Sequence, residues 1–370
     1  MIFLTYNDQP SGIYNSQVID VVKYLNSIQT SEKVKLVALI SIRSFFRNKK
    51  LIRQRLPESM VVPMIPKVGL WKLNYFLLSV FISDKKIMAR GPFAASLALR
   101  LKRAGKADKV IFDARGAYKA ELNEYDVVPN ESIKKEIAEI EKNVVLNSDF
   151  RLAVSEALVN YWKKEFNYNS NEHIVVPCTL SKDLQFKFPA QDKLTALKEQ
   201  AGFNEKDVVI VYSGSSAGWQ SFTLIEKLLT EVFEKNSDVK LLWLTNHIPQ
   251  NSPFIDQFKN RIKTAWVKPE EVKNYLLAGD YGLLYREGSV TNQVASPVKF
   301  AEYLSCGLNV MISEGLGDFS EFVKKHDCGS VGRIDPIKVS YDTKLRNHEL
   351  AMGSLIKENY KTEYLKLISL

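Results

Sequence analysis

The most informative chemistry in this 370-residue sequence lies in the segment SPVKFAEYLSCGLNV, residues 296–310. Ser296 followed by Pro297 is typical of a helix N-cap and first turn, and the free N–H groups that open a helix attract anions. Lys299 lies in that turn, and Glu302 shares its face and could accept hydrogen bonds from a ribose diol. The pattern predicts a diphosphate site. The alternative is an ordinary surface ion pair between Lys299 and Glu302.

A second candidate pair, Asp113 and Arg115, lies in FDARGAYKAE, directly after the apolar run KVIF. This position is the carboxyl end of a predicted strand, where open parallel sheets bind their ligands. Asp113 could orient or deprotonate an acceptor hydroxyl, and Arg115 could hold a phosphate or carboxylate. The alternative is an Asp–Arg pair that only fixes the loop. Arg90 ends another strand and is a weaker anion-site candidate, for which a solvated strand end is the favoured interpretation.

Glycines follow the first predicted strand of each half of the chain. Gly12 follows IFLTY, whereas Gly214 and Gly218 follow DVVIVYS. A glycine in a strand-to-helix turn lets a ligand approach the backbone closely. A plain structural turn explains these glycines equally well, because the full G-x-G-x-x-G fingerprint is absent.

The elements that must position these residues alternate between apolar strands and amphipathic helices. Strands are expected at IFLTY and at residues 34–40, 85–90, 108–116, 151–155, 207–215, 239–246, 264–267, 281–286 and 309–313. Helices are expected at 92–105, 131–147 and 341–370. Such alternation predicts parallel sheets with right-handed crossovers, and therefore an α/β protein with two doubly wound domains. The break is expected near residues 175–193, which contain two prolines and little periodicity.

Composition excludes several classes of protein. An apolar content of 45% and a charged content of 25% are typical of a globular chain. No apolar run reaches the roughly 18 to 20 residues of a membrane span, and the longest, 73–82, is expected to be a buried helix. The first residues lack the basic region of a signal peptide. Three cysteines without a CxxC pair and four histidines without a Cys/His cluster favour a reducing compartment and give no support to a metal site.

The positive charge is confined to one half of the chain. Residues 1–190 carry 29 Lys and Arg against 19 Asp and Glu, whereas residues 191–370 carry 22 against 23. A one-sided basic surface favours an anionic partner. The stretch 43–56 is basic and amphipathic, with Arg43, Arg47, Lys50 and Arg53 around an apolar side assigned to Phe45, Phe46, Ile52 and Leu56. We expect contact with an anionic membrane surface there, with the outer face of a core-packed helix as the alternative.

The string P-x-K-F-x-E-Y-L-x-C-G-L-x-V resembles the donor-site segment of GT-B glycosyltransferases, especially the retaining family 4 type. PSGIYNSQV, FDARGAYKAE and VVPC resemble their glycine turn, their acceptor-side segment and their domain junction. The resemblance implies the GT-B architecture of two Rossmann-like domains facing across a cleft. Residues 1–180 would form the acceptor-side domain and 181–345 the nucleotide-sugar domain, with 346–370 a helix that could pack back on the first domain.

By this resemblance Glu302 would bind the ribose, Lys299 and Arg286 the diphosphate, and Asn292 the sugar, with Ser296, Gly214 and Gly12 beside the donor. Asp113 and Arg115 would face the acceptor and the reacting sugar. Two departures stand out. Val294 occupies the position of the upstream glutamate in the E-x7-E pattern of many relatives. The loop 212–221 lacks their Arg/Lys pair, which leaves room for an inactive relative.

The resulting expectation is a glycosyltransferase that moves a sugar from a nucleotide diphosphate sugar to a glycan or lipid-linked hydroxyl, in bacterial surface polysaccharide synthesis. The resemblance implies retention of configuration, with the donor phosphate helping to deprotonate the acceptor. No D-x-D sequence occurs, so we expect neither a metal nor another cofactor. A cytoplasmic protein, peripheral on the membrane and without a nucleic-acid partner, is expected. The alternatives are a GT-B nucleotide-sugar epimerase and a catalytically lapsed membrane-associated binding protein.

Overall fold

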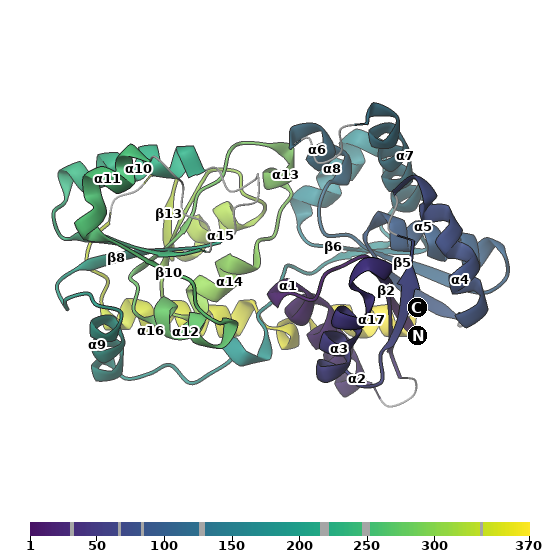
Figure 1. The fold of residues 1–370 in the computed structure, drawn as a ribbon, viewed down its shortest axis with the longest axis horizontal. Helices are drawn as coiled ribbons and strands as arrows, with labels where there is room; N and C mark the ends of the chain where they lie inside the picture. The colour runs from purple at the N-terminus through teal and green to yellow at the C-terminus, as the bar shows by residue number, and fades with distance from the viewer. Residues whose placement is uncertain are drawn as a thin grey trace. The chain divides into compact units, whose positions relative to one another are not determined.

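The computed structural model describes residues 1–29, 33–65, 68–82, 85–125, 130–214, 222–245, 252–333 and 336–370. The chain forms two compact units (Figure 1). Unit 1 comprises Met1–Ser181 and Lys357–Leu370, and unit 2 comprises Lys182–Ile356. The chain therefore leaves its first unit once and returns to it for the last residues.

Unit 1, within its described residues, contains a seven-stranded parallel sheet in the order β3-β2-β1-β4-β5-β6-β7. The strands are β1 (Ile2–Tyr6), β2 (Lys35–Ser41), β3 (Met60–Met64), β4 (Lys86–Arg90), β5 (Lys109–Asp113), β6 (Phe150–Ala153) and β7 (His173–Val175). From β1 the chain builds first toward β3 and then, from β4, in the opposite direction. The loops that follow β1 and β4 therefore turn away from each other. The position between them at the carboxyl edge, where open parallel sheets bind their ligands, is called the crevice of unit 1 below.

The helices of unit 1 are placed by the crossovers between parallel strands. They are α1 (Gly12–Tyr14), α2 (Asp20–Ile28), α3 (Phe45–Arg55), α4 (Asn74–Phe81), α5 (Gly91–Arg103), α6 (Tyr118–Glu124), α7 (Glu131–Asn147), α8 (Glu156–Phe166) and α17 (Lys361–Ser369). Figure 1 shows α17, at the yellow end of the chain, beside the purple α2. Tyr364 and Leu367 of α17 join Val22 and Leu25 of α2 in one apolar core. The last residues thus complete the core of the first unit.

Unit 2 repeats the design with a six-stranded parallel sheet, again counted over its described residues, in the order β10-β9-β8-β11-β12-β13. The strands are β8 (Val208–Ser213), β9 (Val239–Leu244), β10 (Ile262–Ala265), β11 (Tyr281–Leu284), β12 (Asn309–Ile312) and β13 (Gly329–Val331). The helices are α9 (Gln191–Gln200), α10 (Phe222–Lys235), α11 (Pro253–Phe258), α12 (Pro269–Leu277), α13 (Val290–Gln293), α14 (Val298–Ser305), α15 (Phe319–His326) and α16 (Tyr341–Ser354). The strand order reverses between β8 and β11, so a second crevice opens there.

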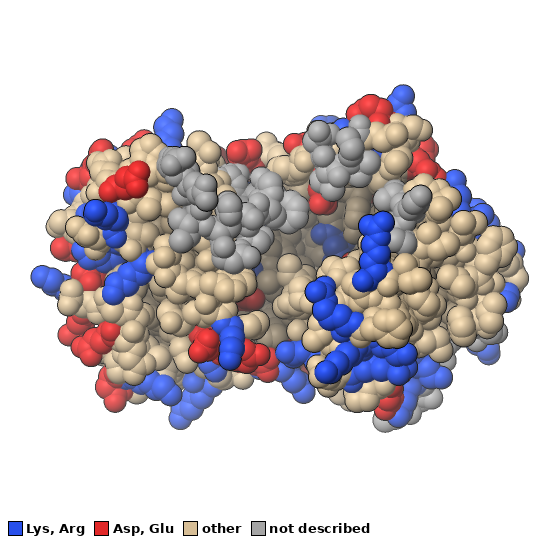
Figure 2. All heavy atoms as spheres, in the orientation of Figure 1, with Lys and Arg blue, Asp and Glu red and all other residues tan. Residues whose placement is uncertain are grey.

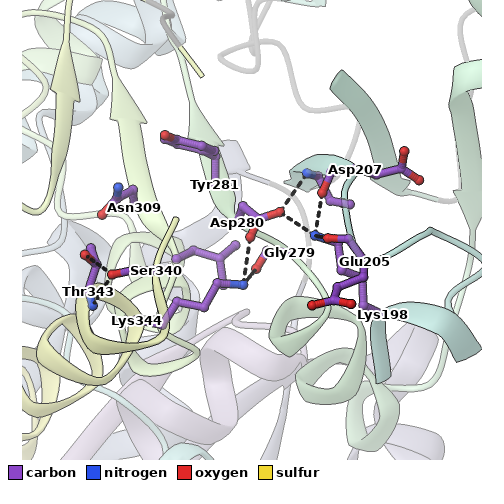
Figure 3. A network of polar contacts seen from close by, with 12 residues as sticks. Lys198, Glu205, Asp207, Gly279, Asp280, Tyr281, Asn309, Ser340, Thr343 and Lys344 are labelled. Atoms are coloured by element: carbon purple, nitrogen blue, oxygen red, sulfur yellow. Dashed lines mark hydrogen bonds and ion pairs between the residues drawn. The ribbon is translucent and has the colours of Figure 1, made fainter. Parts of the chain in front are cut away.

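A buried ion-pair network fixes the opposite, amino edge of the second sheet (Figure 3). The carboxylate of Asp280, just before β11, lies 2.9 Å from the ammonium groups of both Lys198 on α9 and Lys344 on α16. It also accepts a hydrogen bond from the N–H of Val209 at 2.9 Å. Burial alone would raise the pKa of Asp280, but the two lysines hold this pKa below its ordinary value. The network ties two helices to the sheet and leaves the carboxyl edge for ligands.

All ten predicted strands form, but three further strands, β3, β7 and β13, have no sequence prediction. Each of the three is an edge strand of its sheet. Edge strands are paired on one side only, so they can be short and can contain a proline, as Pro63 shows in β3. Their sequences therefore lack the long apolar runs that mark the central strands.

Two helix predictions need correction. The segment 73–82 does form a helix, α4, but it is not buried, because Phe76 and Val80 are 65% and 77% exposed. The segment 341–370 is not one helix: α16 ends at Ser354, a short 3₁₀ turn spans Lys357–Tyr360, and α17 follows. The break coincides with the passage of the chain from unit 2 back to unit 1.

Candidate functional site

The crevice of unit 2 brings together residues that follow β8 and β11. Gly214 follows β8, and Tyr285 and Arg286 follow β11. The N–H of Arg286 donates to Ser313 Oγ at 3.2 Å, and its guanidinium donates to Asn292 Oδ1 at 3.4 Å. Two of the residues proposed for the donor, Arg286 and Asn292, are therefore in contact.

Asn292 is held by the short helix α13. The side chain of Ser289 caps this helix by accepting from the N–H of Asn292 at 3.2 Å, and the Asn292 amide donates to the carbonyl of Glu287 at 3.1 Å. Asn292 is only 2% exposed. These contacts orient its amide oxygen toward Arg286, so the loop presents an arginine with a fixed direction.

The start of α14 differs in detail from the sequence prediction. The helix begins at Val298, its N-cap is Pro297, and no side chain caps it. Ser296 is therefore not the N-cap, although it is buried beside the helix start. Proline supplies no N–H, and its fixed φ suits the entry to a helix. At the other end Gly307 adopts a φ of +80°, as a helix-terminating glycine does.

Lys299 and Glu302 form the ion pair that was the alternative to a ligand site. Lys299 Nζ lies 2.7 Å from Glu302 Oε2, and the two side chains are 29% and 18% exposed. A pair at this spacing on a helix is worth about 0.5 kcal/mol at most. Replacing one partner of this pair by a diphosphate on Lys299, or by a ribose diol on Glu302, therefore costs little free energy.

Tyr303, which the sequence reasoning missed, ties the crevice together. Its hydroxyl accepts from the N–H of Ser213, at the end of β8, at 2.9 Å. Its ring lies on β11, where a Cβ at Gly282 would come within 2.3 Å of it. Burial raises the pKa of Tyr303. The charge of Glu302 also raises it, whereas the charge of Arg286 lowers it. The hydroxyl therefore stays protonated and holds α14 against both strands.

A Cβ at Gly214 would lie 2.7 Å from the Tyr212 hydroxyl, so a larger residue there would require the tyrosine side chain to shift. Gly218 and Gln220, also part of the loop after β8, lie outside the described residues. Val294, where the sequence resemblance implies a glutamate, is buried and 3% exposed. The structure therefore has an apolar side chain inside the protein at this position.

The crevice of unit 1 contains four charged residues in contact. Asp113 Oδ1 lies 2.8 Å from Arg115 Nε, and Asp113 Oδ2 lies 3.0 Å from a terminal nitrogen of the same guanidinium. Arg90, at the end of β4, lies 3.6 Å from Asp113 Oδ2 and 3.3 Å from Asp8 Oδ2 in the loop after β1. Two carboxylates and two guanidinium groups thus alternate along the carboxyl edge of the sheet.

Asp113 is completely buried, whereas Arg90 and Arg115 are each 12% exposed. Although burial alone would lower it, Asp113 raises the pKa of Arg115 above its ordinary value. The Asp–Arg pair named as the alternative is what the structure contains. Arg90 is not a solvated strand end, because the converging ends of β1 and β5 give it two acidic neighbours.

Asp8 was missed by the sequence reasoning because it is a short, polar loop residue without a motif. Burial raises the pKa of Asp8, and the Arg90 charge acts in the opposite direction. Its side chain keeps 38% of its surface exposed. Within the described part of unit 1, Asp8 is the more accessible of the two carboxylates that contact Arg90.

Glu141 of α7 supports the same edge from behind. It is fully buried and accepts from the N–H groups of Tyr118 and Lys119 at 3.1 and 2.7 Å, which caps the start of α6. Burial raises the pKa of Glu141 to about 7. Tyr118 in turn lies over Gly91, where a Cβ would come within 2.9 Å of its hydroxyl.

Gly12 begins α1, whose cap is Ser11, and nothing lies within 4 Å of where its Cβ would be. The fold does not need a glycine there, so the ligand-approach interpretation stays open. No group of three or more His, Cys, Asp or Glu residues among the described residues could hold a metal ion.

No family model matches the chain, and no curated protein sequence matches it. Solved structures do match over its whole length. Sucrose-phosphate synthase from Thermosynechococcus elongatus is 12% identical with a TM-score of 0.69, covering 100% of this chain and 98% of that one. WaaG, a glycosyltransferase involved in lipopolysaccharide biosynthesis, is 9% identical with a TM-score of 0.58, covering 99% and 94%. A putative UDP-N-acetylglucosamine 2-epimerase from Listeria monocytogenes is 10% identical with a TM-score of 0.53, covering 98% and 90%.

These similarities establish the fold. The chain has the GT-B fold, with two Rossmann-like domains that each carry a crevice at the carboxyl edge of a parallel sheet. The fold prediction is confirmed. At identities near a tenth, the fold by itself does not assign a reaction, which must be argued from the side chains.

Proposed function

We propose that this protein is a glycosyltransferase that takes a sugar from a nucleotide diphosphate sugar and transfers it to an acceptor hydroxyl. The observation that carries the proposal is the contact between Arg286 and Asn292 at the crevice between β8 and β11. Lys299 and Glu302 follow on the helix after the same loop. The arginine suits the diphosphate, and the asparagine amide suits a sugar hydroxyl. The lysine–glutamate pair can exchange one partner for the diphosphate or the ribose.

In this proposal Arg286 and Lys299 stabilise the negative charge that develops on the leaving nucleoside diphosphate. Glu302 accepts hydrogen bonds from the ribose once the diphosphate has taken its place beside Lys299. Asn292 contacts the transferred sugar, and Ser296 and Gly214 lie beside the donor. Gly12, in unit 1, stays a position where a ligand could approach the backbone. We propose that no metal ion and no other cofactor takes part, with the cationic side chains in the role that a metal has elsewhere.

On the acceptor side, Arg115 keeps the role that we expected of it, whereas Asp113 acts through the two arginines and not on the acceptor hydroxyl. The buried Asp113 holds Arg90 and Arg115 in place, and Arg115 contacts a phosphate or carboxylate of the acceptor. Asp8, which is partly exposed and has a raised pKa, is the better placed carboxylate to accept a hydrogen bond from the reacting hydroxyl.

The charge of unit 1 and one structural neighbour support the proposed acceptor class. A glycan or lipid-linked acceptor in bacterial surface polysaccharide synthesis agrees with the involvement of WaaG in lipopolysaccharide biosynthesis. We keep retention of configuration as part of the proposal. Arg43, Arg47, Lys50 and Arg53 are all exposed around α3. Figure 2 shows Lys and Arg gathered where Figure 1 places α3, and such a surface would attract an anionic membrane at the cytoplasmic face.

An epimerase is the second candidate, because a UDP-N-acetylglucosamine 2-epimerase shares the fold over nearly the whole chain. Such an enzyme needs the sugar nucleotide and no acceptor. A catalytically lapsed binding protein is the third, since the chain has Val294 where the resemblance implies a glutamate. We favour the transferase because it assigns a role to the charged cluster of unit 1 as an acceptor site, in addition to the donor site of unit 2.

Calorimetric titration with UDP, GDP, ADP and their common sugar conjugates tests the donor site directly. We expect one nucleoside diphosphate to bind and Arg286→Ala to abolish or weaken that binding. The sugar conjugate that binds is then incubated alone and with acceptor glycans. Product that forms only with an acceptor supports transfer, whereas epimerisation of the donor alone supports the second candidate. Absence of binding by every nucleotide would contradict the proposal.

A further inference from the structure

Helix α4 exposes an apolar stripe on its outer side. Leu73, Phe76, Leu77, Val80 and Phe81 recur at the spacing of one helical face and are 43%, 65%, 37%, 77% and 53% exposed. The face toward the core holds Asn74, Leu78 and Ile82, which are all at most 1% exposed. The helix is therefore apolar on both sides, although only one side packs on protein within the described residues.

A helix of this kind is unusual at a water-exposed surface. Surface helices normally place charged residues opposite the core, and helices that are apolar all round are buried in protein or in lipid. Residues 74–81 contain no charged side chain at all. Contiguous exposed apolar surface of this kind marks a place where another molecule binds.

Basic side chains surround this stripe. Lys72 lies just before it and is paired with Glu136 of α7 at 2.8 Å, where both side chains are partly exposed. Arg100 of α5 lies over the ring of Tyr75 at 5.5 Å, and Lys106 donates to the carbonyl of Ser79. Between residues 59 and 107 the sequence has nine Lys and Arg and a single acid. Figure 2 shows the surface near the α4 position of Figure 1 as largely uncharged, with Lys and Arg at its edge.

Helix α3 provides the contrast. Its basic residues are exposed, but Ile52 is 1% exposed and packs in the core, with Phe45 and Leu56 packed against the same cluster. Phe46, 84% exposed, is separated from Ile52 by six residues and points away from it. The predicted apolar side of α3 therefore faces the core except for Phe46, which lies at the start of the helix. Leu51 is 43% exposed but does not share the face of Phe46, so α3 offers charge without a continuous apolar stripe.

An apolar stripe with a basic rim fits an anionic lipid surface. Lipid tails need no polar partner on the stripe, and headgroup phosphates pair with lysine and arginine at its edge. In the part of the chain that the structure describes, no helix has the length and apolarity needed to cross a bilayer. The contact would therefore be with one leaflet.

We propose that α4 lies in the interface of an anionic membrane, with Phe76, Val80 and Phe81 inserted among the acyl chains and Lys72, Arg100 and Lys106 near the phosphates. This surface, and not the charge of α3 alone, anchors unit 1. The inference concerns lipid binding and does not depend on the proposed glycosyl transfer.

The test is co-sedimentation of the full chain with vesicles of phosphatidylcholine, alone or mixed with phosphatidylglycerol. Wild type is expected to bind the mixed vesicles, and Phe76→Ser/Val80→Ser to lower the partition coefficient by roughly tenfold or more. Phe46→Ser is the matched control, because it removes an equally exposed ring from α3, and it is expected to stay within about twofold of wild type.

Two further measurements keep the result interpretable. Because both substituted side chains are exposed, circular dichroism and the melting temperature should not change, and calorimetry should give the same nucleotide affinity for the double variant. Raising the salt concentration should weaken the electrostatic part of binding and leave a residual apolar part.

The proposal fails if wild type does not bind the mixed vesicles or if the double variant binds them as wild type does. It also fails if light scattering shows a dimer that the double variant disrupts, because a second copy of the chain would then cover the stripe. None of these outcomes bears on whether a nucleotide binds to unit 2, so the two proposals are tested separately.

Discussion

The two sheets share one strand order up to the reversal, yet their crevices are built from different kinds of contact. In unit 1, Asp113 is completely buried between Arg90 and Arg115, so opposite charges neutralise one another inside the protein. In unit 2, Arg286 contacts a neutral amide, and the Lys299–Glu302 pair is partly exposed. The first arrangement resists change, whereas the second can exchange a partner for a ligand at low cost. Stability should therefore respond to substitutions in unit 1, and nucleotide affinity to substitutions in unit 2.

The largest effect is expected for Asp113→Ala. It removes the carboxylate that pairs with Arg115 and leaves Arg90 with Asp8 alone, which costs about 3–5 kcal/mol of unfolding free energy. Urea denaturation measures this loss. Asp8→Ala is the control, because the Asp8 side chain is 38% exposed and should cost much less. Equal losses for the two variants would show that the cluster does not depend on the buried carboxylate.

Glu141→Gln tests the support of the same edge through its pH dependence. Because burial raises the pKa of Glu141 from 4.5 to about 7, the folded state binds a proton that the unfolded state releases. Its contribution to stability is thus complete below pH 4.5 and is lost as the pH rises to about 7, by roughly 3 kcal/mol in total. The glutamine variant should lack this decline when melting is followed across that range. A decline of the same size in both proteins would assign it to other groups.

Arg286→Ala is expected to weaken binding of a nucleoside diphosphate by about 10- to 100-fold, because charge-assisted hydrogen bonds to phosphate are strong. The melting temperature of the free protein should change little. Arg346→Ala, an exposed arginine on α16, is the matched control and should bind nucleotide as wild type does. If instead Arg286→Ala melts early and binds nucleotide normally, Arg286 is structural and the contrast between the two crevices disappears.

The smallest effects are expected at the Lys299–Glu302 pair. Lys299→Ala should weaken nucleoside diphosphate binding by about three- to tenfold, and Glu302→Gln should weaken nucleotides more than inorganic pyrophosphate, which has no ribose. Each variant should lose about 0.5 kcal/mol of stability at most, since the pair is partly exposed. If both variants bind nucleotides with unchanged affinity, the two residues form only a surface ion pair and do not contact the ligand. Calorimetry with the two ligands separates the diphosphate contact from the ribose contact.

Much of the fold can be predicted from the sequence, because buried parallel strands are continuous apolar runs. The runs that became β5, β8 and β11 have such sequences, and so the two-sheet GT-B architecture is predicted correctly. The edge strands β3, β7 and β13 are not predicted, because a strand paired on one side needs neither length nor full apolarity. The exposure of α4 is also not predicted, since apolar periodicity does not reveal which face the protein covers.

For the candidate site, the sequence by itself determined the residue types at the strand ends, including Asp113, Arg115, Arg286 and the pair Lys299–Glu302. Only the tertiary structure decided their partners. The convergence of β1, β4 and β5 recruited Asp8 and Arg90, and the packing of α14 on β8 and β11 made Tyr303 a link between them. The physical reason is that strand ends far apart in the chain become neighbours only when the sheet forms, and a charge acquires its environment from those neighbours.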